Sequence, residues 1–324
     1  MSKLPEHIAR RIRVPVIGAP MLRVSGPDLV IATCRAGAIG AFPTANARSA
    51  AELDDWLTRI VSELGEDSQA APWCPNLIIH RGSEVLERDV ESIVRHGVEM
   101  VITSVGSPAP VIDPLHAAGC IVFSDVATVK HARTAIEAGA DGLVLLTAGA
   151  GGQTGWLNGF AFVRAVRSFF AGPLVLAGGI CDGAALLAAQ VLGCDFGYMG
   201  TKLIASEESM ASRAYKQMLV DSSADDILLT RAITGLPASM LTPSLLAAGL
   251  DPATLDESIT PERARELFSE AKNPERPRRW KDIWSAGHTV SGVQRIEPVA
   301  EILAATKREF DEARYRMRSI MEMQ

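Results

Sequence analysis

The 324-residue sequence lacks the cysteine pattern of a disulfide-rich or zinc-binding protein. Its five cysteines are scattered and odd in number, and none of them forms a CxxC pair. The sequence also lacks an excess of basic residues, because its formal net charge is −6. A broad positive surface of the kind that binds nucleic acid is therefore not expected. We predict neither a metal centre nor a nucleic-acid partner.

Long apolar runs are absent as well. No run approaches the roughly 18 to 20 residues of a membrane-spanning helix, and the N-terminal MSKLPEHIARRIR has no apolar signal core. We therefore expect no membrane association and a cytoplasmic enzyme. Apolar residues make up 48% of the chain and charged residues 22%, which is typical of a globular protein. The sequence leaves the oligomeric state open, and an oligomer is possible.

The stretch 174–201 contains two short apolar runs that each end in glycine. Both runs have the length of buried strands, and a helix between Asp182 and Gly193 fits the sequence that separates them. Glycine lets backbone N–H groups approach an anion, and the loops after strands 7 and 8 of a (β/α)8 barrel commonly bind phosphate. The alternative is that these glycines serve only as turns. The pattern predicts a phosphate site at Gly178, Gly179, Gly200 and Thr201.

A weak repeat runs through the chain, in which a helix end and a glycine precede three to five apolar residues. Gly97, Gly119 and Gly139 are 22 and 20 residues apart, and a strand after a helix at this period is the unit of a parallel barrel. The pattern predicts an α/β fold, a (β/α)8 TIM barrel. Its eight strands are expected at Val14–Ile17, Ala38–Ala41, Asn76–Ile79, Met100–Thr103, Ile121–Ser124, Gly142–Leu145, Leu174–Ala177 and Phe196–Met199.

The barrel pattern stops after strand 8. We expect residues 1–205 to form the barrel and residues 206–283 to form a helical insertion, because this segment shows helix starts without strands. Residues 284–324 then return to the barrel and add its final helix. The insertion carries apolar residues that need burial, and the barrel mouth is the nearest surface. We therefore predict that it forms a lid over the active site through residues such as Leu241, Leu245 and Leu246.

Active sites in this fold lie at the C-terminal ends of the strands. Small residues follow strand 1, and they leave space for a flat ring to lie against the backbone. The loop Thr147–Asn158, with the sequence TAGAGGQTGWLN, is rich in glycine and indicates a loop that closes on a ligand. Two histidines, His80 and His288, map to the same mouth.

Seven segments together resemble the nitronate monooxygenase (2-nitropropane dioxygenase) family of FMN-dependent barrels. That family also contains NAD(P)H:quinone reductases and flavin-dependent enoyl-acyl-carrier-protein reductases. The resemblance covers nearly the whole chain. It rests on PVIGAPM, CPNLI, AGADGLVL, AGAGGQTG, LVLAGGICDG, YMGTKLIAS and WSAG.

The resemblance implies an FMN site at the barrel mouth. Residues 18–21 would line the isoalloxazine ring, Asn76 would hydrogen-bond the flavin, and residues 284–287 would approach it from the returning chain. The phosphate would lie at the glycines already identified. The full set implied for the cofactor is Gly18, Ala19, Pro20, Met21, Asn76, Ser124, Ala148, Gly151, Gly152, Gln153, Gly178, Gly179, Gly200, Thr201, Trp284 and Ser285.

Two positions depart from the family pattern. Members usually carry a lysine at the end of strand 5, where this chain has Ser124. The loop after strand 6 usually has a histidine that is proposed to take a proton or to orient substrate, and this chain has Gln153. Because a glutamine amide does not titrate in water, Gln153 is expected to orient substrate or flavin. His288, with His80 behind it, is the expected titratable catalytic group.

The expected function is that of an FMN-dependent oxidoreductase, nitronate monooxygenase-like, which oxidises a small substrate such as an alkyl nitronate with O2. An alternative within the family is a reductase in which NAD(P)H reduces the flavin and a quinone or an enoyl group reoxidises it. From another class, a flavin-free phosphate-binding lyase or isomerase would need a strand-end lysine or paired carboxylates, and Lys202 after strand 8 and Asp125 after strand 5 are the candidates. A third hypothesis is a catalytically silent barrel that binds flavin or another ligand.

Overall fold

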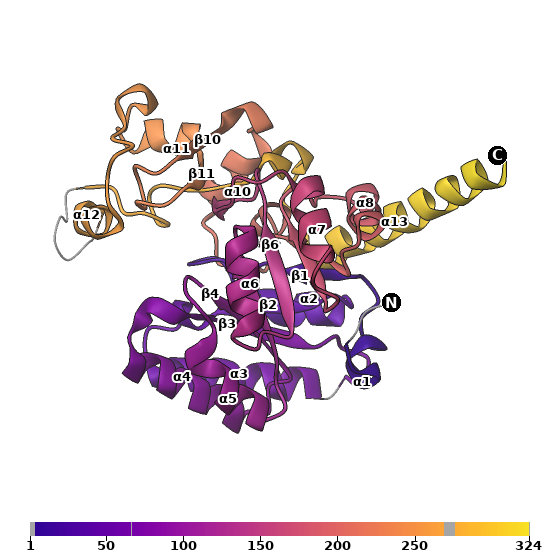
Figure 1. The fold of residues 1–324 in the computed structure, drawn as a ribbon. Coiled ribbons are helices and arrows are strands. Elements are labelled where there is room, and N and C mark those ends of the chain that lie inside the picture. Colours follow the sequence, from indigo (N-terminus) through magenta and orange to yellow (C-terminus); the bar gives the residue numbers. More distant parts are fainter. Residues whose placement is uncertain (1–3, 66, 269–275, 324) are drawn as a thin grey trace.

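The computed structural model describes residues 4–65, 67–268 and 276–323. Within these residues, eight parallel strands form one sheet, and helices cover its outer face (Figure 1). The strand order is β1-β9-β8-β6-β5-β4-β3-β2. A single bridge between Ile17 and Ile39 joins the two edges, so the sheet is a nearly closed barrel. The predicted (β/α)8 fold is confirmed.

Every predicted strand is present in the described chain, with ends that differ from the prediction by a few residues. The near-continuous apolar runs suit a sheet that is buried on both faces. The barrel strands are β1 (Val16–Gly18), β2 (Gly40–Pro43), β3 (Trp73–Ile78), β4 (Met100–Ser104), β5 (Ile121–Val126), β6 (Gly142–Leu146), β8 (Leu174–Ala177) and β9 (Phe196–Met199).

Helices connect the strands and form the outer layer. The last helix packs against α8 and α2, which is the place of the eighth barrel helix, and its C-terminal part projects from the body (Figure 1). The long helices are α2 (Pro27–Arg35), α3 (Ala50–Gly65), α4 (Ser83–Arg95), α5 (Ala109–Ala117), α6 (Val129–Glu137), α7 (Gly159–Arg167), α8 (Gly183–Leu192) and α13 (Val299–Glu322). Short turns of helix are α1 (Glu6–Ala9), α9 (Thr201–Ile204), η1 (Thr44–Asn46), η2 (Ile79–Arg81) and η5 (His288–Gly292).

Side chains alternate along each barrel strand between the interior and the helix-covered face. The interior cluster is apolar, and Leu4 and Ile8 from the α1 segment join it. Interior side chains include Ile17, Ile39, Cys74, Met100, Ile102, Phe123, Val144, Val175, Phe196 and Tyr198. The barrel is therefore a packed core, and a ligand must bind at the strand ends.

The insertion contains strands as well as helices, so the expectation of a strand-free segment is wrong. β10 and β11 pair antiparallel, and the short strand β7 from the loop after β6 joins their sheet in the order β10-β11-β7. Each strand has only a few residues, which is too short to show a period in the sequence. The elements are β7 (Gly152–Gln153), α10 (Arg213–Val220), η3 (Ala224–Asp226), β10 (Ile227–Thr230), β11 (Ala238–Leu241), α11 (Thr242–Ala247), η4 (Pro252–Thr254) and α12 (Pro261–Leu267).

Two apolar clusters anchor the insertion, which is drawn mainly in orange in Figure 1. Leu241 lies in a cluster shared with Val24 and Ile204 of the barrel, whereas Leu245 is buried in a cluster of the insertion itself. Leu246 is 58% exposed, so the expectation that it is buried is wrong. Residues 269–275 of the predicted insertion lie outside the described residues.

Gly183, at the start of α8, tests the attachment of the last helix. A Cβ atom at this position would overlap the backbone of α13 at Phe310 and Thr306. We predict that Gly183→Ala lowers the free energy of unfolding by roughly 1–3 kcal/mol, because two backbones must separate. Urea denaturation measures the effect. The control is Gly65→Ala, since a Cβ there meets no atom within 4 Å. Equal stability of the two variants would contradict the packing.

Candidate active site

Two glycine turns lie side by side at the ends of β8 and β9. Gly178 and Gly179 have φ angles of 110° and 88°, which favour glycine. A Cβ at Gly178 would lie 2.5 Å from Thr147 Oγ1, whereas one at Gly179 would meet open space. No described protein group accepts a hydrogen bond from the N–H of Gly179 or Gly200. These turns therefore offer free N–H donors, as an anion site requires.

The segment after β1 lies beside the second of these turns. The N–H of Ala19 donates to the carbonyl of Met199 at 2.9 Å. A Cβ at Gly200 would lie 3.4 Å from Ala19 Cβ and 3.5 Å from Met21 Sδ. Asn46 Nδ2 donates to the Met21 carbonyl at 2.9 Å and fixes the segment. The structure thus brings the segment 18–21 next to Gly200.

The returning chain packs backbone against backbone on the loop after β6. The N–H of His288 donates to the carbonyl of Gly149 at 2.9 Å. A Cβ on Gly151 would lie 2.7 Å from the Gly287 nitrogen, so this contact requires glycine. The Gly287 N–H donates to Thr201 Oγ1 at 2.9 Å. The loop after β6, the returning chain and the turn after β9 therefore meet at Gly287.

Gln153 lies where the same loop meets the insertion. Its backbone pairs with Ala238 in β11, and the Thr154 N–H donates to the Pro237 carbonyl at 3.1 Å. Thr154 Oγ1 donates to the carbonyl of Thr147 at 2.8 Å. No described residue hydrogen-bonds the half-buried Gln153 side chain. The amide is thus available to a ligand, while the backbone that carries it is fixed.

Asn76 lies buried near the end of β3. Its Nδ2 donates to Ser104 Oγ at 3.1 Å and to the Ile102 carbonyl at 3.3 Å. Ser104 Oγ lies 3.2 Å from Asn76 Oδ1, to which it can donate. These contacts hold the Asn76 amide in one orientation. Its Oδ1 and the Ser104 hydroxyl are the polar groups at the ends of β3 and β4.

Ser124 does not face the mouth, so the prediction for its side chain is wrong. Val122 packs under the helices and Phe123 packs inside the barrel. Because side chains alternate along a strand, Ser124 shares the outer face with Val122. Asp125 is the residue that β5 directs inward. The prediction took Ser124 as the strand end, whereas β5 continues to Val126.

Asp125 and Tyr198 are the polar residues that sequence reasoning did not place in the flavin set. Asp125 Oδ1 and the Tyr198 hydroxyl are buried without a hydrogen-bond partner. Burial raises the pKa of Asp125 to about 8. The pKa of Tyr198 rises well above its usual value, through burial and then through the charge of Asp125. The signal in the sequence was an acidic residue two positions after Phe123, in a strand whose other residues are apolar except for Ser124.

The two predicted histidines are exposed. His80 lies on η2, and a Cβ at Gly106 in the loop after β4 would lie 3.2 Å from its Cδ2. His288 lies against the loop after β6, with Nδ1 2.8 Å from the Cβ position of Gly149. The two histidines therefore border different strand-end loops: His80 lies beside the loop after β4, and His288 lies beside the loop after β6.

Trp284 and Ser285 contact the insertion. The Trp284 ring stacks on Tyr215 with centroids 5.0 Å apart, and the Tyr215 hydroxyl donates to the Ser285 carbonyl at 2.5 Å.

Lys202, the candidate lysine for a flavin-free enzyme, donates from Nζ to the Cys181 carbonyl at 3.0 Å. This contact gives the lysine a structural partner and does not support it as a nucleophile.

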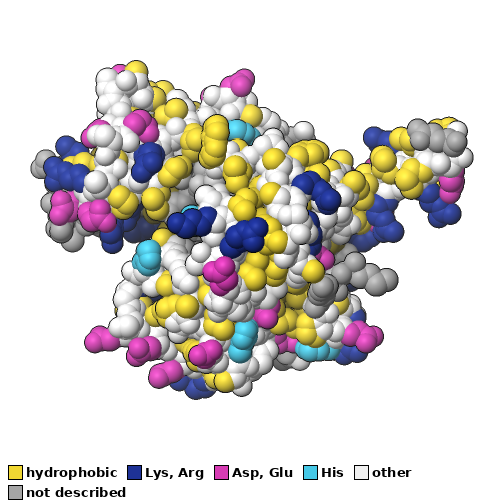
Figure 2. Space-filling model, viewed as in Figure 1, with side chains coloured by type: hydrophobic (Ala, Val, Ile, Leu, Met, Phe, Trp, Pro, Cys, Tyr) yellow, Lys and Arg dark blue, Asp and Glu magenta, His cyan; other side chains and the backbone are white. Residues whose placement is uncertain are grey.

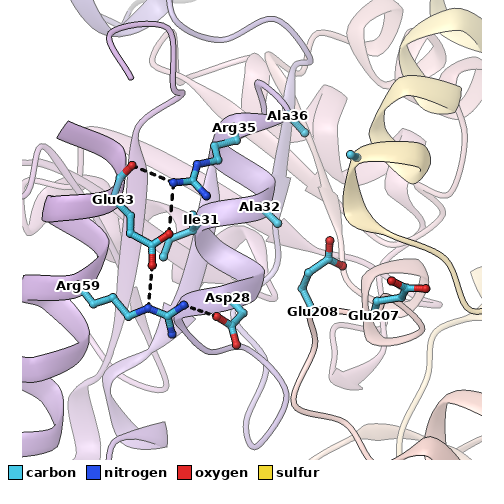
Figure 3. Close-up of a pocket in the computed structure, with 10 residues that line it drawn as sticks. Asp28, Ile31, Ala32, Arg35, Ala36, Arg59, Glu63, Glu207 and Glu208 are labelled. Atoms are coloured by element: carbon cyan, nitrogen blue, oxygen red, sulfur yellow. Dashed lines mark hydrogen bonds and ion pairs between the residues drawn. The ribbon is translucent and has the colours of Figure 1, made fainter. Parts of the chain in front are cut away.

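A groove on the outer surface is lined by none of these residues (Figure 3). It lies against α2 and α3 and is lined by charged side chains, of which Arg59 pairs with Asp28 and Glu63. The Glu208 carboxylate accepts from the Val299 N–H at the start of α13. Arg35 also pairs with Glu63, so the charges on α2 and α3 form ion pairs within the outer layer. Charges of both signs are also interspersed over the face in Figure 2.

Comparison with known proteins identifies the family. A model of the family "Nitronate monooxygenase" matches residues 6–307. The chain belongs to the nitronate monooxygenase family. As a member it is an oxidoreductase enzyme, and members of the family depend on flavin.

Individual relatives agree with this assignment. A nitronate monooxygenase from Paraburkholderia phytofirmans is 25% identical, over 92% of this chain and 93% of its own. A (3aS,4S,5R,7aS)-5-hydroxy-7a-methyl-1-oxo-octahydro-1H-indene-4-carboxyl-CoA dehydrogenase from Rhodococcus jostii is 26% identical, over 76% of this chain and 68% of its own.

Solved structures share the fold of this family member. FabK from Thermotoga maritima superposes with a TM-score of 0.82 at 25% identity, over 99% of both chains. A nitroalkane oxidase from Streptomyces ansochromogenes has a TM-score of 0.78 at 23% identity, over 96% of this chain and 100% of its own.

Among the helices of the described ranges, none combines the length and apolarity needed to traverse a bilayer.

The raised pKa of Asp125 predicts a pH-dependent stability. Between its ordinary value of 3.8 and about 8, the folded chain holds a proton that the unfolded chain releases. Stability therefore falls as pH rises through this window, by at most about 1.4 kcal/mol per pH unit from this group. Asp125→Asn should lose less stability between pH 5 and pH 8 than the unchanged protein, as measured by urea denaturation. Identical losses would show that Asp125 is ionised at neutral pH.

Proposed function

We propose that this family member binds FMN at the barrel mouth. The phosphate would take the N–H groups of Gly178, Gly179 and Gly200 and the hydroxyl of Thr201. The observation that carries the proposal is the pair of adjacent glycine turns with free N–H donors beside the fixed segment 18–21. The isoalloxazine ring would lie among Gly18, Ala19, Pro20, Met21, Asn76, Ala148, Gly151, Gly152, Gln153, Trp284 and Ser285.

The residues present fit such a group. A carbon added at Gly178 would strike Thr147, so the turn admits only backbone near the anion. The position of Gly179 is open, which leaves room for a phosphate. The buried Asp125 Oδ1 and Tyr198 hydroxyl have no hydrogen-bond partner among the described residues, which supports a ligand with polar groups next to them. We infer one phosphate site, which suits FMN better than a dinucleotide.

The reaction we propose is the oxidation of a small nitronate with O2. Bound FMN would supply the electron chemistry, accepting electrons from the substrate and passing them to oxygen. An alkyl nitronate is already an anion and needs no base before electron transfer, so a loop without histidine suffices. Gln153 would orient the substrate through its side-chain amide, and His288 or His80 would move a proton where one must move.

The insertion would shape the substrate pocket as a lid. Its strand β11 pairs with β7, which carries Gln153, and the Leu241 N–H donates to the Trp284 carbonyl at 3.0 Å. Movement of the insertion would therefore shift the loop that carries the proposed substrate contact. We propose O2 as the electron acceptor, which is supported by the match of the chain to the nitronate monooxygenase family.

Gly179 provides the test of the phosphate site. FMN should co-purify with the protein and give visible absorbance. Gly179→Asp should weaken FMN binding on the order of 10³-fold, because two unit charges about 4 Å apart repel by roughly 4 kcal/mol at an effective dielectric of 20. Gly179→Asn is the matched control, since asparagine tolerates a positive φ and carries no charge. Fluorescence titration measures both, and equal affinities would place the phosphate elsewhere.

Gln153 and His288 provide the test of the proton chemistry. Gln153→Ala should slow flavin reduction by a nitronate by an amount equivalent to about 1–3 kcal/mol, without changing the pH profile. His288→Ala should cost more, about 10²-fold or above, if it transfers a proton. Gln153→His should gain activity on neutral nitroalkanes, which need a base. Abolished reduction in Gln153→Ala with an unaffected His288→Ala would reverse the proposed roles. Anaerobic rapid mixing across pH gives these rates.

A further inference from the structure

Two unpaired polar atoms lie inside the barrel, on β5 and β9. They are Asp125 Oδ1 and the Tyr198 hydroxyl, and the described chain offers neither of them a hydrogen-bond partner. An unpaired buried polar atom costs roughly 1–3 kcal/mol, so such atoms are rare and ask for an explanation. Both residues face inward, because Asp125 alternates with Phe123 and Tyr198 with Phe196. Their position below the strand ends makes a ligand at the mouth the natural partner.

The surroundings of Asp125 hold the carboxyl in its neutral form. Burial is the cause of its raised pKa of about 8, and no cation contributes. Among the described inward side chains, Cys74 on β3 and Tyr198 on β9 are the other titratable groups, and burial raises the pKa of each. The inward residues on β1, β2, β4, β6 and β8, and Ile39 just before β2, are not titratable: Ile17, Ile39, Ala41, Met100, Ile102, Ser104, Val144, Leu146, Val175 and Ala177.

We propose that Asp125, as a neutral carboxylic acid, donates a hydrogen bond to the isoalloxazine ring of FMN, with the Tyr198 hydroxyl as a second donor beside it. The inference rests on the proposed function, because it takes FMN as the occupant of the mouth. The polar edge of the ring presents carbonyl oxygens and ring nitrogens as acceptors and one N–H as donor. Two O–H donors complement such an edge.

Ionisation of Asp125 reverses this complementarity. A carboxylate only accepts hydrogen bonds, so opposite a carbonyl oxygen or an unprotonated nitrogen of the ring it would place two acceptors against each other with no proton between them. The site therefore binds FMN tightly while the carboxyl is protonated and weakly once it ionises. This makes Asp125 a cofactor-binding residue that sets the upper pH limit of FMN affinity, through a group on β5 that is separate from the phosphate turns on β8 and β9.

The test measures FMN affinity against pH in the full-length protein. Holoprotein is diluted at pH values from 6.5 to 9.5, and released FMN is measured by its fluorescence. The dissociation constant should rise about tenfold between pH 7 and pH 9, since a one-unit excess of pH over pKa is a tenfold loss of the protonated form. Asp125→Asn keeps an N–H donor that does not titrate, and its constant should change less than about twofold.

Two further variants complete the design. Asp113→Asn removes an exposed carboxyl on α5 and should follow the unchanged protein. Tyr198→Phe should weaken binding about three- to tenfold at every pH, as expected for one lost hydrogen bond, and should keep the pH dependence. Circular dichroism of each variant checks folding, and Asp125→Thr replaces Asp125→Asn if the latter does not fold.

The outcomes separate this inference from the proposed function. A pH-dependent constant that flattens in Asp125→Asn supports the inference. FMN binding with the same pH dependence in Asp125→Asn, or with none in the unchanged protein, would overturn the inference and leave FMN binding intact. Failure of the unchanged protein to bind FMN at any pH would overturn the proposed function and the inference together.

Discussion

The architecture of the mouth depends on one backbone contact, the seating of Gly287 against Gly149 and Gly151. The contact admits no side chain, because a Cβ on Gly287 would lie 2.5 Å from the Gly149 carbonyl oxygen. It also directs the Gly287 N–H at Thr201 Oγ1. The loop after β6, the chain that returns from the insertion and the turn after β9 are therefore fixed relative to one another before any ligand binds, which is the preorganisation that a cofactor site needs.

This seating links the insertion to the chemistry. The returning chain comes directly from the insertion, and the loop that it covers provides β7, the edge strand of the insertion's sheet. Gln153 lies on that strand and Asp125 lies inside the barrel, so the two proposed polar contacts reach the mouth from different directions. Gln153 belongs to a segment that pairs with the insertion, whereas Asp125 belongs to the barrel sheet.

The barrel and the glycine turns after β8 and β9 were predictable because their signals are local. An apolar run followed by Gly178-Gly179 or by Gly200 predicts both a strand and the residue at which it ends. The insertion's strands were missed since Ile227–Thr230 and Ala238–Leu241 are too short for a visible period. The error at Ser124 was one of register, because a one-residue shift in the strand end exchanges the two faces, and only pairing in the sheet shows that Asp125 faces inward.

A crystal structure of the full chain grown with FMN tests the central claim most directly. The account predicts phosphate density at the N–H groups of Gly179 and Gly200, with the ring beside residues 18–21 and within hydrogen-bond distance of Asp125. Ordered FMN in the outer groove between α2 and α3, or a mouth that stays filled by protein with no flavin density, would contradict it.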